Sequence, residues 1–396
     1  MNWKRRYGKI WGRLGMKSNS YALFDLAQWK NGLAFKKINF SSKGKPIIKI
    51  AELKNGITSQ TKFTEKDYGD DVHLTKGDML FSWSGNPETS IDVFWYNLPD
   101  GWLNQHIFKV IPKYFVDKIF FYYLLKSFKT IFSAIASNKQ TTGLGHVTIR
   151  DLKNLNIILP SEKEQKTIGR YLYSLDQKIS VNQTINDNLA ELLQALYQQQ
   201  FCCLNCPDNQ GRLADLCDYS KAKVAVTELS LSTYYSTENM LPGKAGAVDA
   251  ASLPTTTQVI KCQIGDVLIS NIRPYFKKIV YCHSNCGCSM DVICFTPKLP
   301  RLSAYLYSAL YADSFFDFMV AGSKGTKMPR GDKQQIMTYA VHIPTEEEIK
   351  VFNALAIPIL EQIENTHREN IRLSSLRDSL LPKLISGELD VSELGI

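Results

Sequence analysis

Apolar residues recur at alternating intervals of four and three in two long stretches of the sequence, which is the heptad spacing of helices that pair along a seam. The first stretch carries the pattern at Ile168, Leu172, Leu175, Ile179, Asn182, Asn186, Leu189, Leu193 and Leu196. The second carries it at Phe352, Ala356, Ile359, Ile363, Thr366, Asn370, Leu373, Leu376 and Leu380, with a slip of register near Leu376. Each stretch therefore predicts one long helix.

Both stretches begin after a proline with residues that favour a helix N-terminus, Ser161-Glu162-Lys163-Glu164 and Thr345-Glu346-Glu347-Glu348. Pro358 lies inside the second stretch, so we expect a kink or a new helix start there. Polar residues interrupt the heptads midway, and this predicts an antiparallel coiled coil in which Asn182 and Asn186 face Thr366 and Asn370. The alternative is that each helix packs only on its own domain.

The sequence also repeats itself. Lys76-Gly77-Asp78-Met79-Leu80-Phe81-Ser82 recurs 188 positions later as Ile264-Gly265-Asp266-Val267-Leu268-Ile269-Ser270. Phe24-Asp25-Leu26-Ala27 recurs 190 positions later, and the stretch from Lys139 to Pro160 recurs 184 positions later. Three matches in the same order predict an internal duplication. In each copy, Gly-Asp before an apolar run predicts a tight turn that leads into a buried strand.

A chain of 396 residues with 44% hydrophobic residues is long enough for two domains. The predicted fold class is α/β (α+β), with two similar mixed domains separated by the two long helices. The expected boundaries are a basic leader over 1–20, domains over 21–160 and 205–344, a central helix over 161–204, and a distal helix with the C-terminal tail over 345–390. The leader is read either as poorly ordered or as an arm that touches phosphates and bases.

The net charge of +9 favours a polyanionic partner without requiring one. No apolar run approaches the roughly 20 residues that cross a bilayer, and no signal peptide is recognisable, so we expect no membrane contact and a cytoplasmic protein. All nine cysteines lie at position 202 or later. An odd number in one half of the chain fits a reducing compartment better than a disulfide framework.

Reactive groups show no catalytic pattern. The sequence has no phosphate-binding loop, no dinucleotide-binding glycine motif, no His-Glu-x-x-His, no nucleophile elbow and no Asp/Asn-Pro-Pro-Tyr/Phe motif. Cys203 and Cys206 with Cys286 and Cys288 are the strongest metal candidates, but their spacing fits buried or free thiols better than a zinc site. We therefore expect no catalytic residue, no metal and no cofactor in this chain.

Each predicted domain has loops with polar and basic residues of the kind that read DNA, because amides and guanidinium groups match base edges and lysines match phosphates. The candidate DNA-binding residues are Lys36, Lys37, Lys43, Lys45, Ser82, Trp83, Ser84, Lys139, Gln140, Thr141, Thr142 and His146 in the first domain, and Asn271, Arg273, Tyr275, Lys277, Lys278, Lys324, Thr326, Lys327 and Arg330 in the second. Trp83 and Tyr275 are equally well explained as packing residues.

These features together resemble the specificity subunit of type I restriction–modification systems. The resemblance covers nearly everything after Ser20. It is most specific in the twin Gly-Asp strands, in the stretch from Gln140 to Pro160 with the following Glu164-Gln165-Lys166, and in the tail from Leu376 to Leu389. The second unit departs from the first at Thr345–Ile349, and the leader before Tyr21 is longer than expected.

The resemblance implies two target recognition domains, each reading half of a split, asymmetric site in double-stranded DNA. It implies modification subunits that methylate adenine with S-adenosylmethionine, and restriction subunits that use ATP and Mg²⁺ to translocate and cut. Paired helices of roughly 40 Å, at about 1.5 Å per residue, would hold the recognition faces about one DNA turn apart or somewhat more. The alternatives are a stand-alone DNA-modifying enzyme and an assembly scaffold that binds no DNA.

Overall fold

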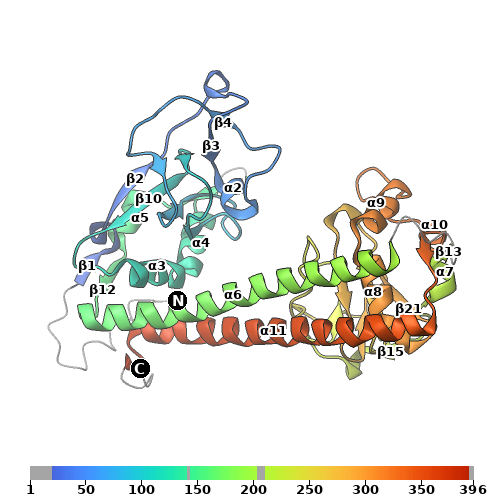
Figure 1. Ribbon diagram of the computed structural model, residues 1–396. Helices are drawn as coiled ribbons and strands as arrows, with labels where there is room; N and C mark the ends of the chain where they lie inside the picture. The colour runs from blue at the N-terminus through green and yellow to red at the C-terminus, as the bar shows by residue number, and fades with distance from the viewer. Residues whose placement is uncertain (1–19, 141–142, 203–209, 392–396) are drawn as a thin grey trace. The chain divides into compact units, whose positions relative to one another are not determined.

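The computed structural model describes residues 20–140, 143–202 and 210–391, and these divide into two compact units. Unit 1 consists of residues 1–177 and 373–396, and unit 2 consists of residues 178–372. Two long helices, α6 (Glu162–Phe201) and α11 (Glu346–Ser386), contribute residues to both units (Figure 1). The expected leader over 1–20 lies outside the described residues, apart from Ser20.

Unit 1 contains short helices and strands before α6. The helices are η2 (Leu23–Leu26), η3 (Lys37–Asn39), α2 (Ile50–Asn55), α3 (Lys118–Ser127), α4 (Lys129–Ser137) and α5 (Ile149–Asn154). The strands are β1 (Ser20–Ala22), β2 (Ala27–Asn31), β3 (Lys45–Ile48), β4 (Phe63–Thr64), β5 (His73–Leu74), β6 (Met79–Ser82), β7 (Ser84–Gly85), β8 (Asp92–Trp95), β9 (Gly101–Leu103), β10 (Ile107–Pro112), β11 (Gly145–His146) and β12 (Asn156–Ile158).

Unit 2 contains a comparable set between α6 and α11. Its helices are α7 (Leu213–Leu216), η4 (Val226–Glu228), η5 (Pro274–Phe276), η6 (Pro300–Leu302), α8 (Ser303–Tyr311), α9 (Asp313–Ala321) and α10 (Lys333–Ile336). Its strands are β13 (Gln210–Arg212), β14 (Cys217–Tyr219), β15 (Lys223–Ala225), β16 (Tyr234–Tyr235), β17 (Gln258–Cys262), β18 (Val267–Ser270), β19 (Ile279–Tyr281), β20 (Cys286–Cys288), β21 (Val292–Pro297) and β22 (Ala340–His342).

The duplication predicted from the sequence is confirmed by the sheet topology. The main sheet of unit 1 has the strand order β2-β10-β6-β8, and that of unit 2 has β14-β21-β18-β19. In both, the strand after the Gly-Asp turn, β6 or β18, lies between two antiparallel neighbours. A second four-stranded sheet follows in each unit, in the order β4-β3-β9-β5 or β15-β17-β20-β16. Both Gly-Asp strands are buried along their whole length, as the apolar runs predicted.

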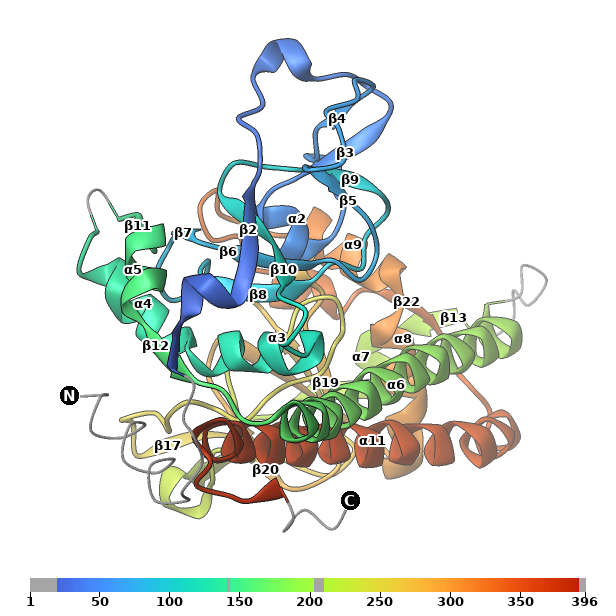
Figure 2. The same cartoon turned by 90° about the vertical axis from the view of Figure 1, so that its left-hand side faces the viewer.

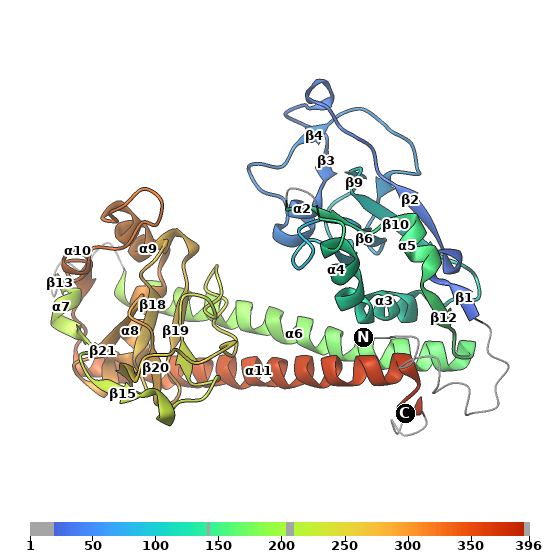
Figure 3. The same cartoon turned by 180° about the vertical axis from the view of Figure 1, so that it is seen from behind.

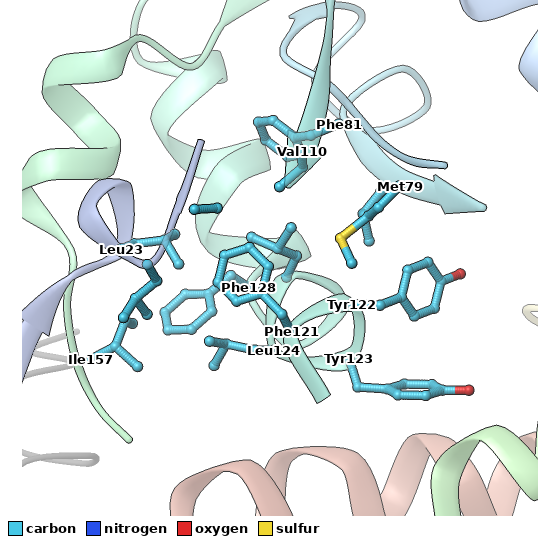
Figure 4. Packing of buried hydrophobic residues seen from close by; sticks show 14 of the residues in the cluster. Leu23, Met79, Phe81, Val110, Phe121, Tyr122, Tyr123, Leu124, Phe128 and Ile157 are labelled. Atoms are coloured by element: carbon cyan, nitrogen blue, oxygen red, sulfur yellow. The ribbon is translucent and has the colours of Figure 1, made fainter. Parts of the chain in front are cut away.

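The core of unit 1 lies between its main sheet and the helices α3 and α4. Figure 4 shows Met79, Phe81 and Val110 from the sheet beside Phe121 and Leu124 of α3. Leu384 and Ile385, from the end of α11, belong to the same buried cluster. Two segments more than 200 positions apart in the sequence therefore complete one core.

The core of unit 2 is built in the same way around α8. This helix packs beside β18 and β21, and Figure 3 shows it among the strands of the unit. Tyr305 of α8 is fully buried against Tyr197 and Phe201 of α6 and Phe352 of α11. The long helices are thus part of the core of this unit.

The two long helices also pair with each other, as the heptads predicted. In unit 2, the Asn182 side-chain amide donates to Asn370 Oδ1 at 2.8 Å and to Glu369 Oε2 at 2.7 Å, and Asn186 donates to the carbonyl of Ile363 at 3.2 Å. Rising numbers in α6 meet falling numbers in α11, so the pairing is antiparallel. The predicted Asn182–Asn370 layer is confirmed, whereas Thr366 bonds to Gln362 of its own helix.

The seam residues of both helices are buried or half-buried, and they come from the predicted heptads: Ile168, Leu172, Leu175, Ile179, Leu189, Ile359, Ile363, Leu373 and Leu380. In unit 1, Arg377 Nη1 of α11 lies 2.6 Å from Asp176 Oδ1 of α6, and Tyr123 Oη donates to the other oxygen at 2.5 Å. Each helix therefore packs on a domain as well as on its partner helix. The heptads serve both the pairing of the helices and the packing on the domains.

Both helix starts are capped as predicted. The Ser161 amide donates to Glu164 Oε2 at 2.7 Å, and the Thr345 amide donates to Glu348 Oε2 at 2.7 Å. The expected new helix start at Pro358 is wrong, because α11 continues through it. Pro358 is exposed, so water can reach the backbone group that loses its partner.

No single helix among the described residues is long and apolar enough to cross a membrane, although the bent pair α3 and α4 passes on length and composition. Most of the large apolar side chains of α3 are buried in the unit 1 core.

The two units differ at one equivalent position of the main sheet. The Gly-Asp aspartates, Asp78 and Asp266, both accept a hydrogen bond from the amide three residues earlier, at 2.9 and 2.8 Å. Lys109, opposite Leu80, forms an ion pair with Asp78 at 2.9 Å. Cys294, opposite Leu268, lies 3.2 Å from Asp266 instead. Burial raises the pKa of Asp266 above its usual range, and no cation among the described residues pairs with it.

Candidate nucleic-acid interface

In each unit, backbone pairing joins two loops that the sequence predicts to bind DNA. In unit 1, β7 pairs with β11, with Ser84 opposite His146. In unit 2, a β-bridge joins Ile272 to Arg330. These two pairs are displaced by 188 and 184 positions, the same displacements as the sequence matches. The duplication therefore preserves a junction between a segment after the Gly-Asp strand and a segment before the long helix.

The junction in unit 1 leaves little space for side chains. A Cβ at Gly145 would lie 2.3 Å from the carbonyl oxygen of Ala136, so only glycine fits there. The Val147 amide donates to the carbonyl of Trp83 at 2.8 Å, which extends the pairing by one residue. Figure 2 shows β7 and β11 side by side at the edge of this unit.

Two of the predicted unit 1 residues at this junction face inward. Ser82 is completely buried in β6, so it cannot reach a base and its selection was wrong. The Trp83 ring stacks on Phe108 at 5.8 Å and its Nε1 donates to Asn31 at 3.2 Å, which favours the packing role. Ser84 and His146 are half-buried and keep part of their surface open.

The remaining unit 1 candidates fall into two groups. Lys139 and Gln140 follow α4 and are exposed, and Lys139 Nζ forms an ion pair with Asp151 at 2.5 Å. This pairing, with hydrogen bonds from Thr148, keeps the pKa of Asp151 low against the opposing effect of burial. Thr141 and Thr142 lie outside the described residues.

The other group, Lys36, Lys37, Lys43 and Lys45, lies around η3 and the start of β3, which no described pairing connects to the junction. The first three are exposed. Lys45 is half-buried, with Nζ 2.8 Å from His73 Nε2 and 5.1 Å from the centre of the Trp102 ring, so it contributes to packing.

In unit 2, the predicted residues between 271 and 278 form one tight turn. Asn271 is only 9% exposed, so little of its side chain is open to a base in this conformation. Arg273 begins the turn in the left-handed region at φ 51°, and its amide donates to the carbonyl of Pro329 at 2.8 Å. Tyr275 is half exposed. Lys278 donates to the carbonyl of Thr237, and burial lowers its pKa.

The second loop of unit 2 carries exposed cations beside this turn. Lys324 and Arg330 exchange two backbone hydrogen bonds of 2.9 Å, which closes a short hairpin with Thr326 and Lys327 exposed at its tip. Lys324 forms an ion pair with Asp332 at 2.5 Å, and Arg330 forms one with Asp291 at 2.9 Å.

Two residues at the turn of unit 2 were not predicted from the sequence to bind DNA. Lys244 has φ 64°, and its Nζ lies 2.8 Å from Asp313, which Lys277 also contacts at 2.8 Å. The two lysines hold the pKa of Asp313 at about 2. Phe276 is 40% exposed beside Tyr275. Lys244 lies far from the turn in the sequence, so no local pattern could have placed it there.

The cysteine candidates do not form a metal centre in the described part of the chain. Cys203 and Cys206 lie outside the described residues, and Cys286 and Cys288 are buried in β20. Among the residues that the structure describes, no three histidine, cysteine, aspartate or glutamate side chains converge in a way that could hold a metal ion.

Comparison with known proteins agrees with this architecture. Residues 17–191 match the family model described as type I restriction modification DNA specificity domain. The type I restriction enzyme MjaIX specificity subunit of Methanocaldococcus jannaschii is 37% identical over 76 residues, which cover 19% of this chain and 18% of that protein. The type I restriction enzyme EcoBI specificity subunit of Escherichia coli is 27% identical over 191 residues, which cover 48% of this chain and 37% of that protein.

The matched regions thus span less than half the length of these two relatives. Among solved structures, the type I restriction-modification system S subunit from M. genitalium aligns over 94% of this chain and 97% of its own length. The TM-score is 0.59 and the sequence identity is 16%, so this likeness establishes a shared fold.

Proposed function

We propose that this chain is a non-catalytic specificity subunit of a type I restriction–modification system and that it reads a split, asymmetric target in double-stranded DNA. The target recognition domains are residues 21–160 and 205–344. Two similar readers on one chain suit a target with two half-sites, and their different loop residues predict two different half-sites.

The observation that carries this proposal is the duplicated loop junction, Ser84 with His146 and Ile272 with Arg330. Both copies keep the same pairing, while the side chains around it differ. A fixed backbone with variable side chains is what a reader of variable base sequences requires, because base contacts specify whereas backbone contacts only position. The antiparallel helices α6 and α11 would set the spacing of the half-sites.

The partners in this proposal are modification subunits that methylate adenine and restriction subunits that cut. S-adenosylmethionine, ATP and Mg²⁺ would act in those partners and not in this chain. Assembly on chromosomal DNA would place the protein in the cytoplasm.

Mapping methylated adenines in the DNA of cells that carry this chain with its modification subunit tests the proposal. We expect one bipartite sequence in which two defined half-sites flank a spacer of fixed length. Replacing residues 21–160 with the first domain of another specificity subunit should change one half-site only, and replacing 205–344 should change the other. A change in both half-sites after one swap would refute the modular assignment.

Two measurements on the purified chain separate this function from its rivals. Methyl transfer from S-adenosylmethionine by this chain alone would indicate a stand-alone enzyme. DNA binding that is independent of sequence, or absent, would indicate an assembly scaffold. The proposal requires no methyl transfer without a partner, and binding that weakens steeply with salt and prefers the mapped target.

A further inference from the structure

The turn Arg273–Lys277 of unit 2 presents two aromatic rings to solvent. Tyr275 is 50% exposed and Phe276 is 40% exposed, and their ring centres lie 4.7 Å apart. Large aromatic side chains stabilise a fold by burying their surface. About half of the surface of these two rings stays exposed to solvent. Their contribution to the stability of the described fold therefore explains their presence only in part.

Backbone strain is concentrated at the same place. Lys244, Arg273 and Lys277 are the non-glycine residues with positive φ in the described part of the chain, at 64°, 51° and 50°. Lys277 directly follows Phe276, and Arg273 precedes Tyr275 by two positions. L-residues adopt this conformation at a cost in energy, and such strain persists where surrounding contacts enforce it and tends to gather at functional sites.

Contacts from three other segments enforce this turn. The amides of Gly243 and Lys244 donate to the carbonyls of Phe276 and Lys277, both at 2.8 Å, and Asp313 holds the ammonium groups of Lys244 and Lys277. On the other side, the Arg273 amide donates to Pro329. The turn is therefore preorganised, and little further ordering is needed for the rings to meet a ligand.

Cations outnumber anions around the rings, because Arg273 and Lys327 add to Lys277, Lys324 and Arg330, which are paired with Asp313, Asp332 and Asp291. The hairpin with Lys324, Lys327 and Arg330 joins the turn through the Ile272–Arg330 bridge. Within the described residues, the side chains of Arg273 and Lys327 have no hydrogen bond or ion pair, so they can meet an external anion. Flat rings with cations beside them match a ligand that has stacked planar groups and phosphates at its edge, which is duplex DNA.

Among its described residues, unit 1 lacks this feature at its equivalent junction. Trp83 is the aromatic residue after its Gly-Asp strand, and its ring stacks on Phe108 while its Nε1 bonds to Asn31. Its backbone is not in the left-handed region. The two units therefore present different surfaces at the same place in the fold.

From these observations, and on the basis of the DNA-reading function proposed above, we infer that Tyr275 and Phe276 form an aromatic wedge that enters one base-pair step of the second half-site. Insertion would partly unstack that step and bend the duplex, and the flanking cations would contact the phosphates on either side. Pyrimidine–purine steps unstack most easily, so the wedge would favour such a step in the half-site read by unit 2 and have no counterpart in the other.

Fluorescence of 2-aminopurine tests this wedge. Duplexes of the mapped target would carry 2-aminopurine at one position at a time, and its emission rises when the base unstacks. With the full-length chain and its modification subunit, we expect a rise of several-fold at one step of the second half-site. The Y275A/F276A variant should lose that rise and bind the target roughly 5- to 150-fold more weakly, the ordinary range for stacking on a base.

Y114A is the matched control, because Tyr114 is 98% exposed on unit 1. It should bind and fluoresce like the parent. An adenine flipped for methylation would stay bright in the variant, which distinguishes flipping from wedging. The folded state of each protein would be checked by circular dichroism, and the measurement on the parent protein needs no variant.

Sequence-specific binding by the parent without a rise at any position of the second half-site would overturn the wedge and leave the proposed function standing. An equal rise in Y275A/F276A would also overturn it. Absence of sequence-specific binding by the parent would instead refute the proposed function. If the rings served a membrane surface, Y275A/F276A would lose binding to vesicles of anionic phospholipid while target binding stayed unchanged, and that result too would overturn the wedge.

Discussion

The polar layer between α6 and α11 makes a quantitative prediction about unit 2. Asn182 is 1% exposed and donates to Asn370 and to Glu369. Asn182→Ala removes both hydrogen bonds and leaves Asn370 Oδ1 without this donor. A neutral hydrogen bond contributes about 0.5–1.5 kcal/mol. The bond to the carboxylate would contribute more if it were buried, but the Glu369 side chain is 45% exposed, so water replaces much of it.

We therefore expect Asn182→Ala to lower the free energy of unfolding by about 1.5–3 kcal/mol. Alanine also favours a helix more than asparagine does, by up to about 0.7 kcal/mol, and this gain works against the loss. Asn188→Ala is the matched control, because Asn188 is an exposed asparagine on the same helix and its substitution gives the helix gain alone. The difference between the two variants isolates the layer.

Urea unfolding can assign the loss to the correct unit. All six tryptophans occur at position 102 or earlier, so their emission reports on the N-terminal part of the chain, whereas ellipticity at 222 nm reports on all helices. With an m-value of about 2 kcal/mol/M, the ellipticity midpoint of Asn182→Ala should fall by about 1 M relative to Asn188→Ala.

A double-mutant cycle with Asn370→Ala should give a coupling of roughly 1 kcal/mol. Equal midpoints for Asn182→Ala and Asn188→Ala, or no coupling in the cycle, would refute the assignment of this layer as a stabilising contact.

Three further outcomes are expected. Leu384→Ala should lower the stability of unit 1 by about 2–5 kcal/mol, because Leu384 is fully buried in its core; tryptophan emission against urea measures this, and an effect no larger than that of Leu376→Ala, at a 41% exposed position, would contradict it. Burial raises the pKa of Asp266 above its ordinary value of 3.8, so its contribution to stability is fully present below that value and is lost as pH rises through the folded pKa; Asp266→Asn should therefore gain stability relative to the parent as pH rises from below 3.8 to neutral, and a urea-midpoint difference that does not change with pH would count against this. Lys327→Ala should reduce the slope of log affinity for target DNA against log salt by about 1, whereas Lys350→Ala on α11 should leave it unchanged, and equal slopes would exclude a phosphate contact by Lys327.

The long-range plan of this fold could be predicted because it rests on periodic signals. Heptads in two stretches identified α6 and α11, and the polar layers identified the Asn182–Asn370 contact. The repeated Gly-Asp motif located β6 and β18, because a tight turn before an apolar run has few other structural meanings. These signals depend on neighbours in the sequence or on repetition, both of which are visible without coordinates.

The site was harder to predict because burial of a polar residue depends on distant segments. Ser82 ends a strand that is covered on both faces, and nothing local distinguishes it from an exposed serine. Lys244 contacts the turn Arg273–Lys277, although it lies more than 25 positions earlier in the sequence. Pro358 did not end α11, although a proline removes one backbone hydrogen bond of a helix. Packing holds the helix on both sides of this exposed position, so the loss of one bond does not end it.

The discontinuous make-up of unit 1 has a consequence for synthesis in the cell. Leu384 and Ile385 are buried with residues that the ribosome makes more than 200 codons earlier. During translation, the core of the first domain therefore stays incomplete until the whole of unit 2 has been synthesised. Unit 2, in contrast, is an unbroken stretch of chain and can close first. We expect nascent chains that stop before residue 373 to expose apolar surface on the first domain and to recruit chaperones there.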